Sequence, residues 1–311
     1  MSATKVSELL NLFVSLSELG DGTVELYQQA VDKLIDCLGD VEAAAIRPLD
    51  AQAVLCAMKA GRSPTTVNIQ MRCLKRLFNW MVESEVIAAS PFAKVKSLRE
   101  TRRGHTPYTE TELAQLIAAC PDQRWRLIVA LAITTGMRRG EILNLTVGEI
   151  DYLAGAIQIA PKSQSAATWQ WSIKDRDSRQ VPINGALEGI LLRRQAELPD
   201  GQPYVCLTPQ RYRHLIVVQQ RLGKLPYDQR KCPECNFVRS FQEICRRAGV
   251  PYRMFHATRG TGLTVMAEKG LQPHDIAKIA GHSDIRTTYQ YYVRCRQSEL
   301  LEKARSKSYN F

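Results

Sequence analysis

Apolar residues recur at every third or fourth position through the first 100 residues of the chain, and no stretch there alternates as a β-strand would. The clearest helix begins at Ser63-Pro64, where a serine cap precedes a proline in the first turn. Its expected buried stripe consists of Val67, Met71, Leu74, Phe78 and Met81. This pattern predicts an all-helical N-terminal domain over residues 1–100.

The periodicity changes once in the rest of the chain, after Gly155. Three short strands are predicted there, at residues 156–160, 168–173 and 179–183. Helices precede and follow them, and Gly136 ends one helix just before another begins. We therefore expect a mainly α protein with a small β-sheet in a second domain, residues 108–311, joined to the first by a linker at residues 101–107.

The chain carries a formal net charge of +11, and its sequence pI is near 9.3. This excess predicts a polyanionic partner, first nucleic acid and second an anionic membrane surface. No run of 18 apolar residues is present and the polar start lacks a signal-peptide pattern, so no membrane span is expected. Nine cysteines, an odd number scattered through helical stretches, are typical of a reducing cytoplasm.

Basic side chains gather in two places that can face a phosphate backbone. Three lie off the apolar stripe of the Ser63-Pro64 helix: Arg72, Lys75 and Arg76. Five lie in the sequence KVKSLRETRRGHTP: Lys94, Lys96, Arg99, Arg102 and Arg103. These eight residues are candidate DNA contacts, although a solvated helix face and a soluble hinge explain the same composition.

An insert at about residues 204–236 contains Cys232-Pro-Glu-Cys235. Two thiolates from one knuckle supply half of a tetrahedral zinc site, which Cys206 and His214 can complete. Structural zinc is one interpretation of the insert, and reduced free thiols are the other. A thioredoxin-like redox site is not expected, because no βαβ pattern surrounds the motif.

The segment from Phe255 to Val293 carries the most chemistry. It begins with His256 and Arg259, which are three residues apart and therefore share one face of a helix. A histidine and an arginine at a helix start suit an anion, because free backbone N–H groups and the helix dipole favour negative charge there. Tyrosines follow His282, so the segment offers a phenolic nucleophile rather than a metal ligand. Phosphate chemistry is the hypothesis to test.

Two further cations are candidates outside this segment. Arg138 lies beside Glu141 at a helix junction, where a guanidinium can be held rigidly, although a surface Arg–Glu pair is the simpler interpretation. Lys174 lies at the tip of the second predicted turn between the strands. Lysines at hairpin tips are usually plain solubilising charges.

Together these residues resemble the tyrosine recombinase (phage integrase) family. TGMRRGEILNL is similar to its first arginine box, and WSIKDRDSRQVPI to its hairpin lysine and Arg-x-Val-Pro strand. FHATRGTG is similar to its His-x-x-Arg box, and AGHSDIRTTYQYY to its Gly-His box, with the usual nine residues from His282 to Tyr291. The segment after Ser63 resembles the family's core-binding domain, so the resemblance covers about residues 20–300. The run HATR lacks the usual acid, and the cysteine insert is not a general family feature.

The resemblance implies a site-specific recombinase that consists of a helical core-binding domain and an integrase-like catalytic domain. Tyr291 would attack a scissile DNA phosphate and form a 3′-phosphotyrosine, while Arg138 and Arg259 hold the phosphate oxygens. Neither ATP nor a metal is then required for catalysis, because the phosphodiester energy is kept for rejoining.

The same resemblance implies the supporting roles. Lys174 would be the general acid for the leaving 5′-oxygen, and His256 would help deprotonate the tyrosine or hold a phosphate oxygen. His282 would hydrogen-bond the phosphate, and Glu141 would orient His256 or Arg138. Double-stranded DNA is the implied partner, bound by a tetramer on paired sites that forms from monomers. The implied location is the cytoplasm, at a bacterial or phage-type nucleoid, and the implied origin is a mobile element.

Several alternatives stay open at this point. Tyr289 and Tyr292 compete with the assigned nucleophile, and Lys162 competes with the assigned hairpin lysine. The same residue set also suits a type IB topoisomerase-like relaxase, and a non-catalytic DNA-binding protein can retain this fold. A zinc-knuckle RNA binder depends on Cys232 and Cys235 alone.

Overall fold

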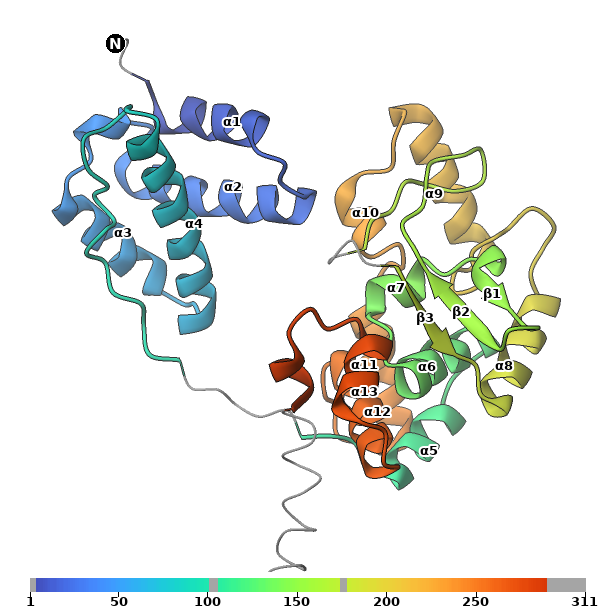
Figure 1. The fold of residues 1–311 in the computed structure, drawn as a ribbon. Helices are drawn as coiled ribbons and strands as arrows, with labels where there is room; N and C mark the ends of the chain where they lie inside the picture. Colours follow the sequence, from blue (N-terminus) through green and yellow to red (C-terminus); the bar gives the residue numbers. More distant parts are fainter. Residues whose placement is uncertain (1–3, 101–105, 174–177, 290–311) are drawn as a thin grey trace, which may run out of the picture. The chain divides into compact units, whose positions relative to one another are not determined.

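Two separate hydrophobic cores divide the chain between residues 103 and 104. The computed structural model describes residues 4–100, 106–173 and 178–289, and each part is drawn in Figure 1. We call the parts the N-terminal unit (Met1–Arg103) and the C-terminal unit (Gly104–Phe311). The predicted fold class, mainly α with a small β-sheet, is confirmed.

Helices form the regular structure of the described N-terminal unit, apart from one isolated β-bridge between Lys5 and Glu42. They are α1 (Val6–Leu16), α2 (Asp21–Leu38), α3 (Pro48–Lys59) and α4 (Pro64–Glu83), with a 3-10 turn at Ala43–Ala45. Helix α4 begins as predicted, because the Ser63 hydroxyl accepts a hydrogen bond from the Thr66 backbone N–H at 3.2 Å. Its predicted apolar stripe is buried in the core of this unit.

The segment at residues 94–100 runs along α4 rather than forming a hinge. Val95 is buried, and its carbonyl accepts a hydrogen bond from Lys75. The Asn68 side chain, only 5% exposed, donates to the Leu98 carbonyl at 2.9 Å and accepts from the Leu98 N–H at 2.8 Å. The amide therefore pairs with the backbone as a strand edge would, and residues 94–100 are not the soluble hinge that their basic composition also allowed.

The described C-terminal unit places nine helices around a three-stranded sheet (Figure 1). The helices are α5 (Glu110–Ala118), α6 (Gln123–Thr135), α7 (Arg139–Leu143), α8 (Gly185–Ala196), α9 (Pro209–Leu222), α10 (Tyr227–Lys231), α11 (Phe237–Ala248), α12 (His256–Glu268) and α13 (Pro273–Ala280), with a 3-10 turn at Val147–Glu149. The sheet has the order β1 (Ile150–Asp151), β2 (Ala156–Ile159) and β3 (Arg179–Pro182). Both pairings are antiparallel, and Ile157 lies opposite Val181.

The strand predicted at residues 168–173 is wrong, and β2 pairs directly with β3. Instead of joining the sheet, Trp169 is buried and stacks on Tyr204 with ring centroids 3.8 Å apart. Gln219 of α9 donates to the carbonyls of Ser165 and Thr168, at 3.1 and 3.3 Å. This stretch therefore packs against the insert, and these tertiary contacts outweigh its preference for a strand.

Helices α6 and α12 pack closely at Gly262. A Cβ atom added there would lie 2.0 Å from the Ile133 carbonyl oxygen, so only glycine fits. This contact positions the N-terminal half of α12, which carries two predicted site residues. Among the residues that the structure describes, no helix is both long and apolar enough to cross a membrane.

Candidate active site

The C-terminal end of α13 holds three arginines through three successive carbonyls. Residues 279, 280 and 281 accept hydrogen bonds from Arg179 Nε at 2.8 Å, Arg259 Nη2 at 2.9 Å and Arg138 Nη2 at 2.6 Å, respectively. Carbonyls at a helix C-terminus lack partners within the helix and lie at the negative end of its dipole, so guanidinium groups bind well there. Side chains from α7, β3 and α12 thus meet at one point.

Glu141 fixes the position of Arg138 at the start of α7. Its Oε2 accepts from the Arg138 backbone N–H at 2.7 Å, and its Oε1 accepts from Arg138 Nη1 at 3.1 Å. The glutamate side chain is 3% exposed and the arginine side chain is 23% exposed. The pair is therefore part of the interior, and the interpretation as a surface Arg–Glu pair does not apply.

Arg259 is 2% exposed and is bound from three directions. Its guanidinium donates to the carbonyls of Gly136 and Ala280 and to His282 Nε2, the last at 2.8 Å. Because a guanidinium can only donate, Nε2 accepts and the ring proton lies on Nδ1, which donates to the Thr288 hydroxyl at 2.8 Å. In this structure His282 is a neutral ring that orients Arg259.

Only glycine suits position 281 at the end of α13. Its φ of +65° ends α13 in the left-handed conformation, and an added Cβ would lie 2.8 Å from Arg179 Nη1. A side chain at this position would displace the guanidinium from the Ile279 carbonyl. The close approach of Arg179 therefore explains why the Gly-His motif begins with glycine.

The pKa of His282 is lowered to about 4, first by burial and then by the positive charges of Arg259, Arg138, Arg179 and His256. Below pH 6.5 the histidine binds a proton in the unfolded chain but stays neutral in the folded protein. Its contribution to the free energy of unfolding should therefore fall as the pH drops from about 6.5 to 4 and stay constant above 6.5. We expect His282→Gln to flatten this part of the profile of thermal unfolding midpoint against pH.

His214→Gln, which replaces an exposed histidine on α9, is the matched control and should keep the wild-type profile. A wild-type slope in His282→Gln would contradict the assignment of a buried neutral ring.

His256 is the first residue of α12 and is exposed, one turn before Arg259 on the same helix. Lys162, the competing lysine, forms an ion pair with Glu149 at 2.8 Å and lies 4.7 Å from the centre of the Trp171 ring. Its side chain is 11% exposed, which makes it part of the packing at the base of the β2–β3 connection.

Three of the tyrosine and lysine candidates fall outside the described residues. They are Lys174, Tyr291 and Tyr292. Tyr289, the last described residue before the two tyrosines, is 49% exposed. Their assignments therefore remain sequence predictions.

The four candidate zinc ligands are not brought together. Cys206 is buried, and burial raises the pKa of its thiol to about 12. Cys232 donates weakly to the Glu234 carbonyl at 3.5 Å, while Cys235 and His214 are exposed. Within residues 4–100, 106–173 and 178–289, no three His, Cys, Asp or Glu side chains form a group that could hold a metal ion. These positions favour free thiols over structural zinc.

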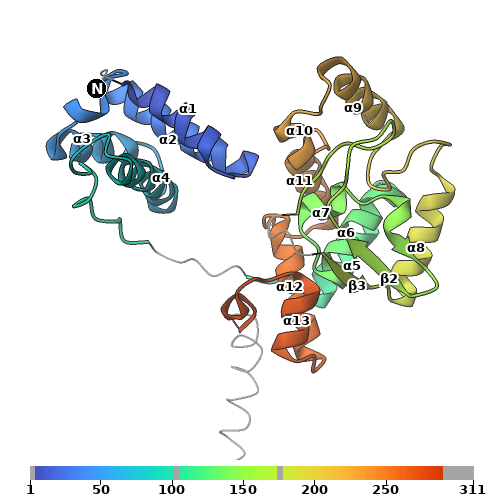
Figure 2. The same cartoon turned by 45° about the horizontal axis from the view of Figure 1, so that its top comes forward.

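The insert instead packs against elements that carry the site. Figures 1 and 2 show α9 and α10 at the end of the C-terminal unit opposite α13. Asn144, at the end of α7, donates to the Arg230 carbonyl of α10 at 3.0 Å and accepts from the Trp169 indole at 2.7 Å. The insert therefore supports α7 and the β2–β3 connection.

The predicted DNA contacts of the N-terminal unit differ in their surroundings. Arg72, Lys94, Lys96 and Arg99 are exposed, and Arg76, also exposed, pairs with Glu83 at 3.2 Å. Lys75 is half-buried and bound to the Val95 carbonyl, whereas Arg102 and Arg103 lie outside the described residues. Lys94, Lys96 and Arg99 form a basic edge of the 94–100 segment, because Val95 and Leu98 between them pack on the core of the N-terminal unit.

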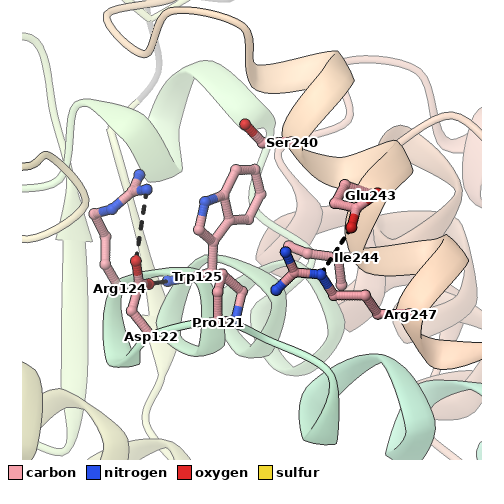
Figure 3. Close-up of a pocket in the computed structure, with 8 residues that line it drawn as sticks. All are labelled: Pro121, Asp122, Arg124, Trp125, Ser240, Glu243, Ile244 and Arg247. Carbon is pink, nitrogen blue, oxygen red and sulfur yellow. Dashed lines mark hydrogen bonds and ion pairs between the residues drawn. The ribbon is translucent and has the colours of Figure 1, made fainter.

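A pocket elsewhere in the C-terminal unit does not include the arginine cluster. It lies between the start of α6 and α11 (Figure 3). Its lining residues are Pro121, Asp122, Arg124, Trp125, Ser240, Glu243, Ile244 and Arg247. None of these was predicted to take part in chemistry.

A helical domain with a small antiparallel sheet, and with arginines from α7 and α12 bound beside a Gly-His turn, defines an integrase-type catalytic domain. The model of the phage integrase family matches residues 108–299, and the chain belongs to this family. This confirms the resemblance deduced from the boxes.

Relatives and solved structures agree with this assignment. The chain is 26% identical over 95% of its length to "Tyrosine recombinase XerA" of Pyrococcus furiosus, of which it covers 92%. It is also 26% identical to "Tyrosine recombinase XerC-like" of Caldanaerobacter subterraneus and to "Putative defective protein IntQ" of Escherichia coli, over 75% of its own length in both cases. The chain spans 63% and 60% of the lengths of these two relatives.

The fold is also that of solved integrase structures. The Tn1549 transposon integrase in complex with circular intermediate DNA is 19% identical, with a TM-score of 0.70 over 96% of this chain and 99% of the other. A lambda integrase tetramer bound to a Holliday junction is 15% identical, with a TM-score of 0.68 over 93% of this chain and 78% of the other.

Proposed function

We propose that this protein is a site-specific DNA recombinase that cuts and rejoins strands through a 3′-phosphotyrosine. The observation that carries the proposal is the convergence of Arg138, Arg179 and Arg259 on one helix end, where Glu141 is the one buried carboxylate that the described residues place among them. Three positive charges against one negative charge leave an excess that suits a bound anion. The DNA phosphate is that anion.

In the proposed reaction, the Tyr291 oxygen attacks the phosphorus and the bond from phosphorus to the 5′-oxygen breaks. The tyrosine proton passes to His256, and Lys174 gives a proton to the leaving 5′-oxygen. Arg138 and Arg259 stabilise the charge that develops on the non-bridging oxygens. Rejoining is the reverse attack by a 5′-hydroxyl, so neither ATP nor a metal takes part.

We further propose that the basic surface of the N-terminal unit grips double-stranded DNA and that four protomers assemble on two paired sites from monomers in the cytoplasm. The exposed Arg72, Lys94, Lys96 and Arg99 support the first part. The lambda integrase tetramer on a Holliday junction supports the second. The transposon integrase among the structural relatives supports a role in a mobile element.

The test is covalent trapping on a nicked suicide DNA substrate taken from sequence flanking the gene. A protein–DNA adduct that survives denaturation is the expected result. Tight DNA binding without any adduct would overturn the proposal in favour of a non-catalytic DNA-binding protein. Relaxation of a one-site plasmid without recombinants would instead indicate a topoisomerase-like enzyme.

A further inference from the structure

Arg179 is the third guanidinium of the site and has no part in the reaction described above. It is the first residue of β3, and its side chain is 9% exposed. Its Nη1 and Nη2 donate to the two Glu141 carboxylate oxygens at 3.0 and 2.7 Å, and its Nε donates to the Ile279 carbonyl at 2.8 Å. One side chain thus joins the sheet to α7 and to the end of α13.

Glu141 is shared by two arginines. Each of its oxygens accepts one hydrogen bond from Arg179 and one from Arg138. Burial acts to raise the pKa of Glu141, but the hydrogen bonds and charge of Arg179, followed by those of Arg138, hold it below its ordinary value. The residue is therefore a buried carboxylate beside an arginine that must attract a phosphate.

A carboxylate in this position is a competitor for the phosphate, because charge interactions in a water-poor interior are strong. With Arg138 alone beside it, the charge of Glu141 would cancel that of the arginine. With Arg179 added, these three side chains carry a net positive charge, and the planar guanidinium of Arg179 binds both carboxylate oxygens. Among the described residues, the Arg138 guanidinium then donates one hydrogen bond to Glu141 at 3.1 Å and one to the Gly281 carbonyl at 2.6 Å.

We propose that Arg179 is a positioning residue that neutralises and holds Glu141. The positive charge of Arg138 is then not cancelled by the carboxylate, and its guanidinium stays oriented toward the scissile phosphate. This inference rests on the proposed recombinase function. It assigns a chemical role to Arg179, the arginine of the Arg-x-Val-Pro strand.

The prediction is a specific pattern among four proteins in the rate of adduct formation on the suicide substrate. Arg179→Met should react about 10–100-fold more slowly than wild type, as expected for a small misplacement of a phosphate-binding group. Arg179→Met combined with Glu141→Gln should react about tenfold faster than Arg179→Met, because the carboxylate that would otherwise cancel the charge of Arg138 is gone. If Arg179 only stabilised the fold, adding Glu141→Gln would not restore the rate of adduct formation.

Arg194→Met is the matched control. Arg194 is also a buried arginine of the C-terminal unit, 6% exposed, and it donates to the Val205 and Leu207 carbonyls and to Glu197. Its loss should leave the cleavage rate of folded protein within a few-fold of wild type. Unfolding midpoints and DNA affinities are measured for every variant, and Arg179→Gln replaces Arg179→Met in both arms if the methionine variant does not fold.

The outcomes separate the two proposals. A wild-type protein that forms no adduct would overturn the recombinase function. With an active wild type, the positioning role is overturned by an Arg179→Met variant that reacts at the wild-type rate, by a double variant no faster than Arg179→Met, or by an equal loss in Arg194→Met.

Discussion

Replacing Tyr291 with phenylalanine is expected to abolish the covalent protein–DNA adduct completely. The substitution removes only the phenolic oxygen, so no group remains at that position to attack the phosphorus. The affinity for DNA should stay within about twofold, since the loss of one hydroxyl outside the predicted DNA-contact residues is a small perturbation. The measurements are denaturing gel analysis of the suicide-substrate reaction and a binding titration on intact duplex.

Tyr289→Phe and Tyr292→Phe are the matched controls, and both should still form the adduct. The choice among the three tyrosines rests on the nine-residue interval from His282, whose ring is bound to Arg259 and to Thr288, three residues before Tyr291. An adduct that persists in Tyr291→Phe and disappears in one of the other two variants would move the nucleophile to that residue.

The second large effect is expected in Gly262→Ala. Its Cβ would lie 2.0 Å from the Ile133 carbonyl oxygen and 2.8 Å from the carbonyl carbon, and both are backbone atoms that cannot rotate away. Alanine favours a helix by about 1 kcal/mol over glycine, but forced separation of α6 and α12 should outweigh this gain. We expect a net loss of about 1–3 kcal/mol or more in the free energy of unfolding, or about 2–4 °C in Tm for each kcal/mol.

Gly189→Ala is the control for this prediction. Gly189 lies within α8, and its nearest neighbours are atoms of the flexible Arg193 side chain at 3.6 Å or more. This substitution should leave Tm unchanged or raise it, because only the helix preference changes. If both variants were equally stable, the close contact between α6 and α12 would be refuted. Gly262→Ala should also slow cleavage in any folded fraction, because α12 carries Arg259 against the Gly136 carbonyl.

The elements that the sequence predicted well are those with local signals. The start of α4 follows from Ser63 and Pro64, and the end of α6 follows from Gly136, which adopts the left-handed conformation. The strand expected at residues 168–173 failed because backbone carbonyls at residues 165–168 accept hydrogen bonds from the Gln219 and Tyr212 side chains of α9, more than 40 residues away in sequence. No local pattern contains that contact.

The site shows the same division. Arg138, Glu141, Arg259 and His282 could be found from motif spacing, and the structure brings them together. Arg179 could not be assigned a role, because its partners lie 38 and 100 residues away. A motif match identified the strand but not the guanidinium's target. The zinc interpretation of the insert depended on a ligand set that the described fold does not assemble.

The separation of the chain into two hydrophobic cores has a consequence for protein engineering. The exposed basic side chains of α4 and of residues 94–100 belong to the N-terminal unit, and the arginine cluster belongs to the C-terminal unit. A combinatorial library limited to Arg72, Lys94, Lys96 and Arg99 would therefore vary the surface proposed to meet DNA without touching the α6–α12 contact. Variants could then be selected for new target sequences while the C-terminal unit, with its arginine cluster, keeps its thermal stability.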